Sequence, residues 1–466
     1  MIRGYPRPAS VAPGETLVLH VATDAPCFRI RFYRFVDRFE PVGGSARLPG
    51  RQAEPRGAAE DWDWPAYPFE IPRDWPSGVY VAHLQEHGTH EPWTEAGPGA
   101  WSDRGAALFV VRGAGESALL YKIPLATYHA YNSTGGGCFY EHQTRSETPP
   151  GSKVSLHRPG GGIGGDVWGA ADHYDPTSLR QTFAHWDARF IRWLARNGYA
   201  PEFCTDFDIH GDPGLLERHR LLVSVGHDEY WTEPARDAVE AFVARGGNVA
   251  FFGANVCWWR IHAVDAGAAI VCHQGGPRGA LDHWWPETGA NRPEDSLTGV
   301  SYRHGGGWWD GPRRTGGFAV QDPTHWAFAG TGLGRGERFG ADSSPPLVGY
   351  ECDGAPLDAF DEATGIARLA ADSERSGTPR AFTPLAVGVL DGNWQELPPR
   401  EAHPAGAGIH AATIGVFTHG GTVFTAGTTD WAQVLDAGEP RVDRITRNVV
   451  DRLLAARPRR YRVSPR

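Results

Sequence analysis

Two apolar runs in the middle of the chain are each followed by side chains that can do chemistry. They are His227, Glu229 and Tyr230 after the first run and Asn255 after the second. An imidazole and a carboxylate exchange protons as general acid and base, and an amide donates a hydrogen bond to a developing oxyanion. A phenolate binds hard metal ions. These residue types fit hydrolysis of a polar bond, provided that the fold brings them together.

The elements that must position these residues form a strand–helix–strand unit. The runs 221–225 and 248–253 are short and apolar, as strands covered on both faces are. Between them, Thr232 suits a helix N-cap, apolar residues recur at helical spacing, and Gly246-Gly247 ends the pattern. Such a unit is nearly always parallel, and open α/β sheets bind ligands beyond the carboxyl ends of their strands. We therefore expect the four residues at one sheet edge.

Further candidates follow other predicted strands. Glu351 comes after a short apolar run, and Tyr131 and Asn132 come at the end of a long apolar strand expected over 118–132. Eighteen tryptophans fit an aromatic-lined cleft and a core beneath long loops equally well. We predict that Glu351 handles protons and that substrate is bound by Tyr131, Asn132, Trp258 and His283.

The chain divides into two predicted domains. Residues 1–115 alternate in polarity between Gly/Pro turns, which predicts a small all-β, immunoglobulin-like sandwich. Residues 118–460 mix apolar strands with amphipathic helices, of which 187–197 and 441–455 are the clearest, and predict an α/β domain. The segment 262–346 shows little regular pattern, and loops of such length are usually functional or disordered.

Composition excludes several classes of partner. The net charge is −10 with no basic stripe, which argues against nucleic acid. No apolar run reaches the ~18 residues of a membrane span, and the N-terminus lacks the apolar segment of a signal peptide. We expect a cytoplasmic protein whose six scattered cysteines are reduced thiols. The sequence leaves the oligomeric state open, with a homo-oligomer among the options.

The stretch 225–261 resembles a known family. It contains a G-H-x-E-Y motif, then a predicted helix that ends in two glycines, and then a second predicted strand followed by an asparagine and aromatic residues. It is similar to the catalytic, C-terminal domain of the N,N-dimethylformamidase large (beta) subunit, and the resemblance covers about 118–460. It implies a class I glutamine-amidotransferase-like three-layer α/β sandwich with a mostly parallel sheet behind a small β domain. It also implies an amide hydrolase with a mononuclear iron (Fe³⁺) held by tyrosines and a glutamate.

The resemblance carries over to individual residues. Tyr230 matches the motif's tyrosine and is the implied metal ligand, while Glu351 resembles a glutamate that follows a late strand in the family. Val300 stands where the family has a ligand glutamate, so Glu294 is the nearby candidate for that role. Tyr199 is our candidate for a second tyrosine ligand.

Three functions remain open on the sequence. The first is hydrolysis of a small amide, in which His227, Glu229 and Glu351 transfer protons and Asn255 stabilises the oxyanion. The second is a thiol-dependent, amidotransferase-like enzyme that uses Cys257, although no G-x-C-x-G elbow surrounds it. The third is a metal-free module that binds a small molecule or carbohydrate in a tryptophan-rich cleft.

Overall fold

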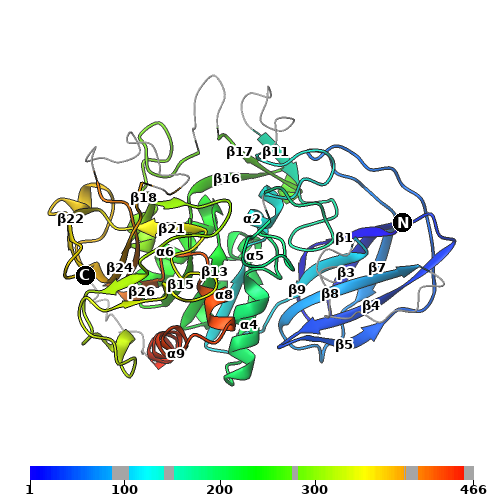
Figure 1. The fold of residues 1–466 in the computed structure, drawn as a ribbon. Helices are drawn as coiled ribbons and strands as arrows, with labels where there is room; N and C mark the ends of the chain where they lie inside the picture. Colours follow the sequence, from blue (N-terminus) through cyan, green and yellow to red (C-terminus); the bar gives the residue numbers. More distant parts are fainter. Residues whose placement is uncertain are drawn as a thin grey trace, which may run out of the picture. The chain divides into compact units, whose positions relative to one another are not determined.

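The computed structural model of the protein describes residues 1–86, 104–140, 152–169, 171–274, 282–392, 394 and 408–455 (Figure 1). The chain folds into two compact units. Unit 1 comprises 1–117, 121–208 and 259–282, and unit 2 comprises 118–120, 209–258 and 283–466. The units interleave along the sequence, so the boundaries 1–115 and 118–460 stay a prediction.

The described residues of the first 111, which are 1–86 and 104–111, contain strands and no helix, as the alternating pattern predicts. A three-stranded antiparallel sheet has the order β1-β3-β7, and a second sheet has the order β2-β9-β8-β4-β5, with β6 paired to β4. Inward side chains of both sheets share one core, which includes Leu19 of β3 and Ile30 of β4. The strands are β1 (Arg3–Arg7), β2 (Ser10–Val11), β3 (Thr16–Ala22), β4 (Cys27–Phe35), β5 (Phe39–Gly44), β6 (Leu48–Pro49), β7 (Ala66–Glu70), β8 (Gly78–Glu86) and β9 (Ala106–Val111).

The long strand expected over 118–132 was a wrong prediction. Only Leu119–Ile123 is extended, as β10, and Pro124 then stands at the N-cap of α2 (Leu125–Ala130). Because every side chain of α2 is buried, the segment lacks the one-sided polarity that marks a helix in sequence. Tyr131 and Asn132 therefore follow a helix instead of ending a strand.

The other elements that begin in unit 1 are short, apart from the predicted helix α4. They are β11 (Ser152–Ser155), α4 (Asp187–Arg196), β12 (Glu202–Thr205), α5 (Asp206–Gly211), β16 (Trp259–Val264), the 3₁₀ turn η2 (Asp265–Gly267) and β17 (Ala269–Cys272). The strands β11, β17 and β16 form an antiparallel ladder.

Unit 2 contains a mixed sheet in the order β13-β15-β26-β25-β24-β19-β20. The strands β13, β15 and β26 are parallel, but every pair from β26 to β20 is antiparallel. The sheet is therefore less parallel than the resemblance implies. The cause is local: β25 turns directly into β26 at Gly420, whose φ of 83° suits a tight hairpin, and a hairpin joins antiparallel strands.

The predicted strand–helix–strand unit is confirmed as β13 (Leu221–His227), α6 (Glu233–Ala244) and β15 (Asn248–Ala254). Thr232 caps α6 by accepting a hydrogen bond from the backbone N–H of Ala235 at 3.4 Å. Helix α6 packs against β15 and β26, while α8 and α9 pack against β15. The parallel register places Gly226 opposite Gly253, so the two strands end side by side.

Two further expectations are corrected. Glu351 does not follow a strand but begins one, β21, and the irregular-looking segment 262–346 contains the end of β16 and the strands β17 to β20. The pattern is weak because these strands are short, and because β18, which reads SYRHGGG, is rich in glycine and buried on both faces. The remaining elements are η1 (Leu215–Arg218), β14 (Tyr230–Thr232), α7 (Asp295–Thr298), β18 (Ser301–Gly307), β19 (Phe318–Val320), η3 (Trp326–Phe328), β20 (Arg338–Phe339), β21 (Glu351–Gly354), β22 (Leu357–Asp361), β23 (Ile366–Leu369), η4 (Ser373–Arg375), β24 (Thr383–Val389), β25 (Ala411–His419), β26 (Gly421–Thr425), α8 (Trp431–Asp436) and α9 (Pro440–Ala455).

Among the helices that the structure describes, none has the length and apolar character needed to cross a membrane.

Candidate active site

His227, the last residue of β13, lies between two carboxylates. Its Nε2 is 2.8 Å from Oε2 of Glu351, the first residue of β21, and 3.4 Å from Oε2 of Glu229. All three side chains are buried. The strand ends therefore bring together three of the predicted proton-transfer residues, although Glu351 and His227 are far apart in sequence.

The neighbouring carboxylates keep the His227 ring charged. Burial by itself lowers the pKa of His227, but the negative charge and hydrogen bond of Glu351, with smaller contributions from Glu229 and Asp353, raise it from 6.5 to about 9. At neutral pH the ring is therefore an imidazolium whose Nε2–H points at Glu351. A buried imidazolium beside a carboxylate can donate its proton as a general acid.

Asn255 lies directly after β15 and supports the same carboxylate. Its Nδ2 is 3.1 Å from Oε2 of Glu351 and 3.1 Å from Nε2 of His227. Because the protonated Nε2 cannot accept a hydrogen bond, the amide must donate to Glu351. The Oδ1 atom of Asn255 is buried and has no hydrogen-bond partner among the described residues.

The backbone beside Asn255 is held by a further carboxylate, Asp353. The N–H groups of Asn255 and Val256 donate to Oδ1 and Oδ2 of Asp353 at 2.8 and 3.2 Å, where Asn255 has a φ of 50°. Burial raises the pKa of Asp353 to about 7; the two N–H bonds oppose that rise, and the charges of Glu294 and Glu351 add to it. Asp353 thus fixes the turn that aims the Asn255 amide.

The rest of the G-H-x-E-Y segment forms a scaffold for the site. Ser224 donates a hydrogen bond at 2.5 Å to the side chain of Asp228, whose carbonyl accepts from the N–H of Cys257 and from the Trp231 indole, both at 2.9 Å. These bonds tie the end of β13 to the loop after β15. The ring of Tyr350 also meets the His227 ring edge-on, with centroids 6.3 Å apart.

The residues proposed as iron ligands fit that role only in part. Tyr230 is fully buried in β14. Glu294 is also buried, and its Oε2 accepts no hydrogen bond from the part of the chain that the structure describes. However, Oε1 of Glu294 accepts from Ser301 and from Arg303, whose guanidinium lies 3.2 Å away and competes with a cation for the carboxylate. Oε2 is therefore the oxygen of Glu294 that is left for a metal ion, and its role as a ligand stays a prediction.

Two other residues bear on the metal prediction. Val300, at the position of the family's ligand glutamate, is a buried apolar residue that ends the loop before β18. Tyr199 belongs to unit 1, where its ring stacks on Trp193 with centroids 5.5 Å apart.

The predicted substrate-binding residues separate into two groups. In unit 2 the half-buried Trp258 packs edge-on against His283 at 4.7 Å and against Tyr302 at 5.5 Å. In unit 1 the contacts of Tyr131 and Asn132 are local. Tyr131 stacks on Tyr140 at 4.5 Å, and Asn132 donates to the carbonyl of Pro159 at 2.9 Å.

Cys257 is a poor nucleophile in this structure. Its side chain is buried, and burial raises the pKa of the thiol to about 12. The thiolate, which is the reactive form, is therefore scarce at neutral pH. The six cysteines, all within the described residues, are buried, and none of them forms a disulfide.

Comparison with known proteins identifies the family. The family described as N,N-dimethylformamidase beta subunit-like, C-terminal, matches residues 27–445, so the match extends well before residue 118. The N,N-dimethylformamidase beta subunit of Alcaligenes sp is 35% identical over 75 residues, and that of Paracoccus aminophilus is 32% identical over 74 residues. Each alignment covers 16% of this chain and 10% of the relative, so the aligned part is about a tenth of the relatives' length. Because the family match spans most of the chain, this protein belongs to the N,N-dimethylformamidase beta subunit-like, C-terminal family.

Proposed function

We propose that the protein hydrolyses the C–N bond of a small amide and that His227 and Glu351 carry the proton transfers. The observation that supports this most is the Nε2–Oε2 contact of 2.8 Å between a buried imidazole and a buried carboxylate. The names of the relatives add the substrate class, since both are N,N-dimethylformamidases.

The reaction adds water across the C–N bond. A carboxylate, Glu229 or Glu351, takes a proton from water as its oxygen bonds to the carbonyl carbon. The His227 imidazolium gives its Nε2 proton to the amide nitrogen as the C–N bond breaks, so the products are a carboxylic acid and an amine. Transfer of the carboxyl proton back to the imidazole restores both groups.

In this scheme Asn255 has a different role from the predicted oxyanion donor. Its amide N–H is already directed at Glu351, so it holds that carboxylate in line with His227. Its unpaired Oδ1 is an acceptor suited to an N–H of substrate or to the attacking water.

A substitution at Glu351 tests the proposal. Glu351→Gln keeps the side-chain shape and still accepts from Asn255, but it removes the charge that keeps His227 protonated. We expect release of amine from N,N-dimethylformamide and related small amides to fall by about 10²- to 10⁴-fold, the usual contribution of a general acid–base group. The control is Glu362→Gln, an exposed carboxylate on the β22–β23 turn, which should leave the rate unchanged. Equal rates in wild type and Glu351→Gln would refute the assignment.

The iron proposal rests on Tyr230 and is tested separately. A ferric ion bound to a tyrosinate would supply a Lewis acid for the carbonyl. If Tyr230 holds it, the purified protein contains near-stoichiometric iron with a visible charge-transfer band, and both are lost in Tyr230→Phe without loss of the fold. Full iron content in Tyr230→Phe would remove Tyr230 from the site, and an iron-free, active wild type would remove the metal.

We also infer a finer fold. The parallel β13–α6–β15 unit and the adjacent β26 support an amidotransferase-like sandwich for the α/β part. The antiparallel sheet β1-β3-β7 shares a core with the second sheet, which is antiparallel except for the parallel pair β2–β9. This arrangement supports an immunoglobulin-like sandwich for the first 111 residues.

A further inference from the structure

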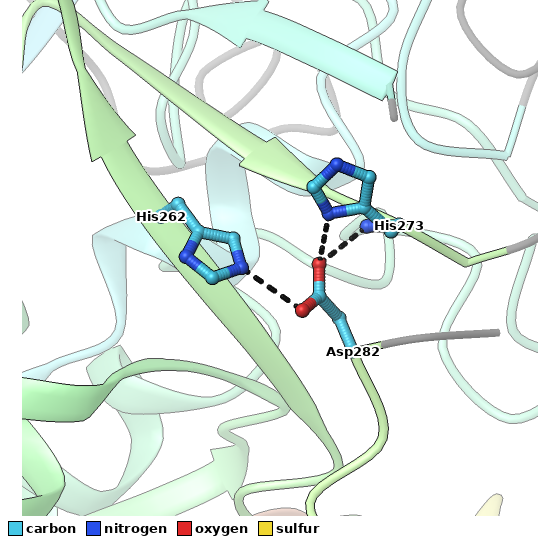
Figure 2. A group of neighbouring side chains, drawn as sticks. All are labelled: His262, His273 and Asp282. Carbon is cyan, nitrogen blue, oxygen red and sulfur yellow. Dashed lines mark hydrogen bonds and ion pairs between the residues drawn. The ribbon is translucent and has the colours of Figure 1, made fainter. Parts of the chain in front are cut away.

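Three side chains of unit 1 that play no part in the proposed hydrolysis converge on one point. His262 lies on β16, His273 follows the last residue of β17, and the side chain of Asp282 lies between the two imidazole rings (Figure 2). Nε2 of His262 is 2.9 Å from Oδ1 of Asp282, and Nδ1 of His273 is 2.6 Å from Oδ2. The two imidazoles thus face the two oxygens of a single carboxylate.

The position of the three residues is set by backbone bonds as well as by their side chains. Strands β16 and β17 pair with His262 opposite Val271, which brings the start of one strand near the end of the other. The N–H of His273 donates to Oδ2 of Asp282 at 2.7 Å, and the N–H of Arg260 donates to the Asp282 carbonyl at 2.7 Å. These bonds preorganise the three side chains for binding an ion.

The Asp282 carboxylate lies at the centre of the cluster and is 1% exposed. It accepts hydrogen bonds from the ring of His262 and from the backbone N–H and ring of His273. Its Oδ1 also accepts from Nε and Nη2 of Arg260, both at 3.2 Å, which orients the carboxylate from the side.

We propose that His262, His273 and Asp282 form a binding site for a divalent transition-metal ion of the zinc class. Among the described residues, they are the group of three histidine, cysteine or acidic side chains whose ligand atoms all lie within 4.8 Å of one another. Zinc takes imidazole nitrogens and carboxylate oxygens at about 2.0–2.2 Å, which places two ligand atoms of a tetrahedral ion roughly 3.3 Å apart. The two nitrogen–oxygen pairs, now 2.9 and 2.6 Å apart, therefore need to open slightly to admit the ion.

Metal binding would use the atoms that now hydrogen-bond. The two ring nitrogens that face Asp282 lose or shift their protons, and the ion takes the place of those protons between ring and carboxylate. Each carboxylate oxygen keeps one other hydrogen bond, Oδ1 from Arg260 and Oδ2 from the backbone N–H of His273, and has a second lone pair for the ion. The His262 side chain is 40% exposed, so a fourth position is open to water or a small ligand.

The test uses the full chain without a histidine tag, stripped of metal by a chelator. Titration with Co²⁺, followed by its visible d–d absorption, and with Zn²⁺, followed by calorimetry, should show one saturable site. His262→Gln and His273→Ala should each weaken that site at least about tenfold, because even residues behind the ligands cost that much. The matched control is His419→Ala, an exposed histidine at the end of β25.

Two further variants separate this site from the proposed iron. Tyr230→Phe should leave Co²⁺ binding unchanged, and His262→Gln should leave any iron content unchanged. Thermal melting without metal shows whether each variant is folded, and His262→Gln is the tolerant choice because the ring is partly exposed. Absence of a saturable site in the wild type, or equal binding in wild type and His262→Gln, would overturn the proposal and leave an ion-paired cluster.

Discussion

At the scale of single residues, the charge of His227 depends on the carboxylates around it. Glu351 and Glu229 are within 3.4 Å of its Nε2, and they keep its pKa near 9 although the ring is buried. In an unfolded chain the same ring titrates near 6.5. The folded protein therefore binds one more proton than the unfolded chain between about pH 6.5 and pH 9.

This difference predicts how stability changes with pH. A raised histidine pKa stabilises the fold fully below pH 6.5, and that contribution is lost as pH rises through 9. The loss should be on the order of 3 kcal/mol in the free energy of unfolding, measured by urea denaturation at a series of pH values. In His227→Gln the curve should be flatter over the same interval. If both proteins show the same slope, His227 is not the group that titrates.

The sequence predicted which of these residues lie close together only where the strand pattern is clear. His227 and Asn255 follow apolar runs, and the ends of parallel strands meet at one edge, so their proximity was predictable. Asp353 was not chosen as a site residue because its role depends on a backbone turn at positive φ, which side-chain patterns do not reveal. Likewise, His262 and His273 meet only through the register of two short strands.

At the scale of elements, the close approach of β13 and β15 sets the position of the site. Gly226 lies opposite Gly253, and a Cβ at Gly253 would lie 2.2 Å from the carbonyl oxygen of Gly226. Backbone atoms cannot move aside as a flexible side chain does. The two glycines therefore let the strand ends approach closely enough for both His227 and Asn255 to contact Glu351.

Gly253→Ala should force the strand ends apart. We expect a loss of about 1–3 kcal/mol in the free energy of unfolding, as for other overpacked sites, together with a lower rate of amide hydrolysis. The control is Gly211→Ala at the end of α5, where nothing lies within 4 Å of an added Cβ. Wild-type stability and hydrolysis rate in Gly253→Ala would show that the spacing of β13 and β15 does not depend on a glycine at this position.

Elements were predicted best where their pattern is long. The unit β13–α6–β15 and the helices α4 and α9 carry clear periodicity, and the structure confirms them. The prediction for 118–132 failed because α2 is buried on all sides. The strands within 262–346 were missed because they are short and because β18 is rich in glycine. In both cases tertiary burial, which local sequence does not encode, decides the structure.

At the scale of the whole molecule, the family assignment and the site geometry support one function from different directions. The family match covers residues 27–445, but the named relatives align over only a tenth of their own length. The proposed activity therefore rests on the buried His227–Glu351 pair in unit 2. The mixed sheet of that unit also shows that the mostly parallel sheet implied by the resemblance does not give the direction of each strand.

The measurement that tests the central claim most directly is hydrolysis of small amides in H₂¹⁸O, with products followed by mass spectrometry. Hydrolysis predicts a carboxylic acid carrying one ¹⁸O atom from solvent and an equal amount of free amine, both dependent on Glu351. Recovery of unchanged, unlabelled amide across N,N-dimethylformamide and its small relatives would contradict the account and favour a module that binds without catalysis.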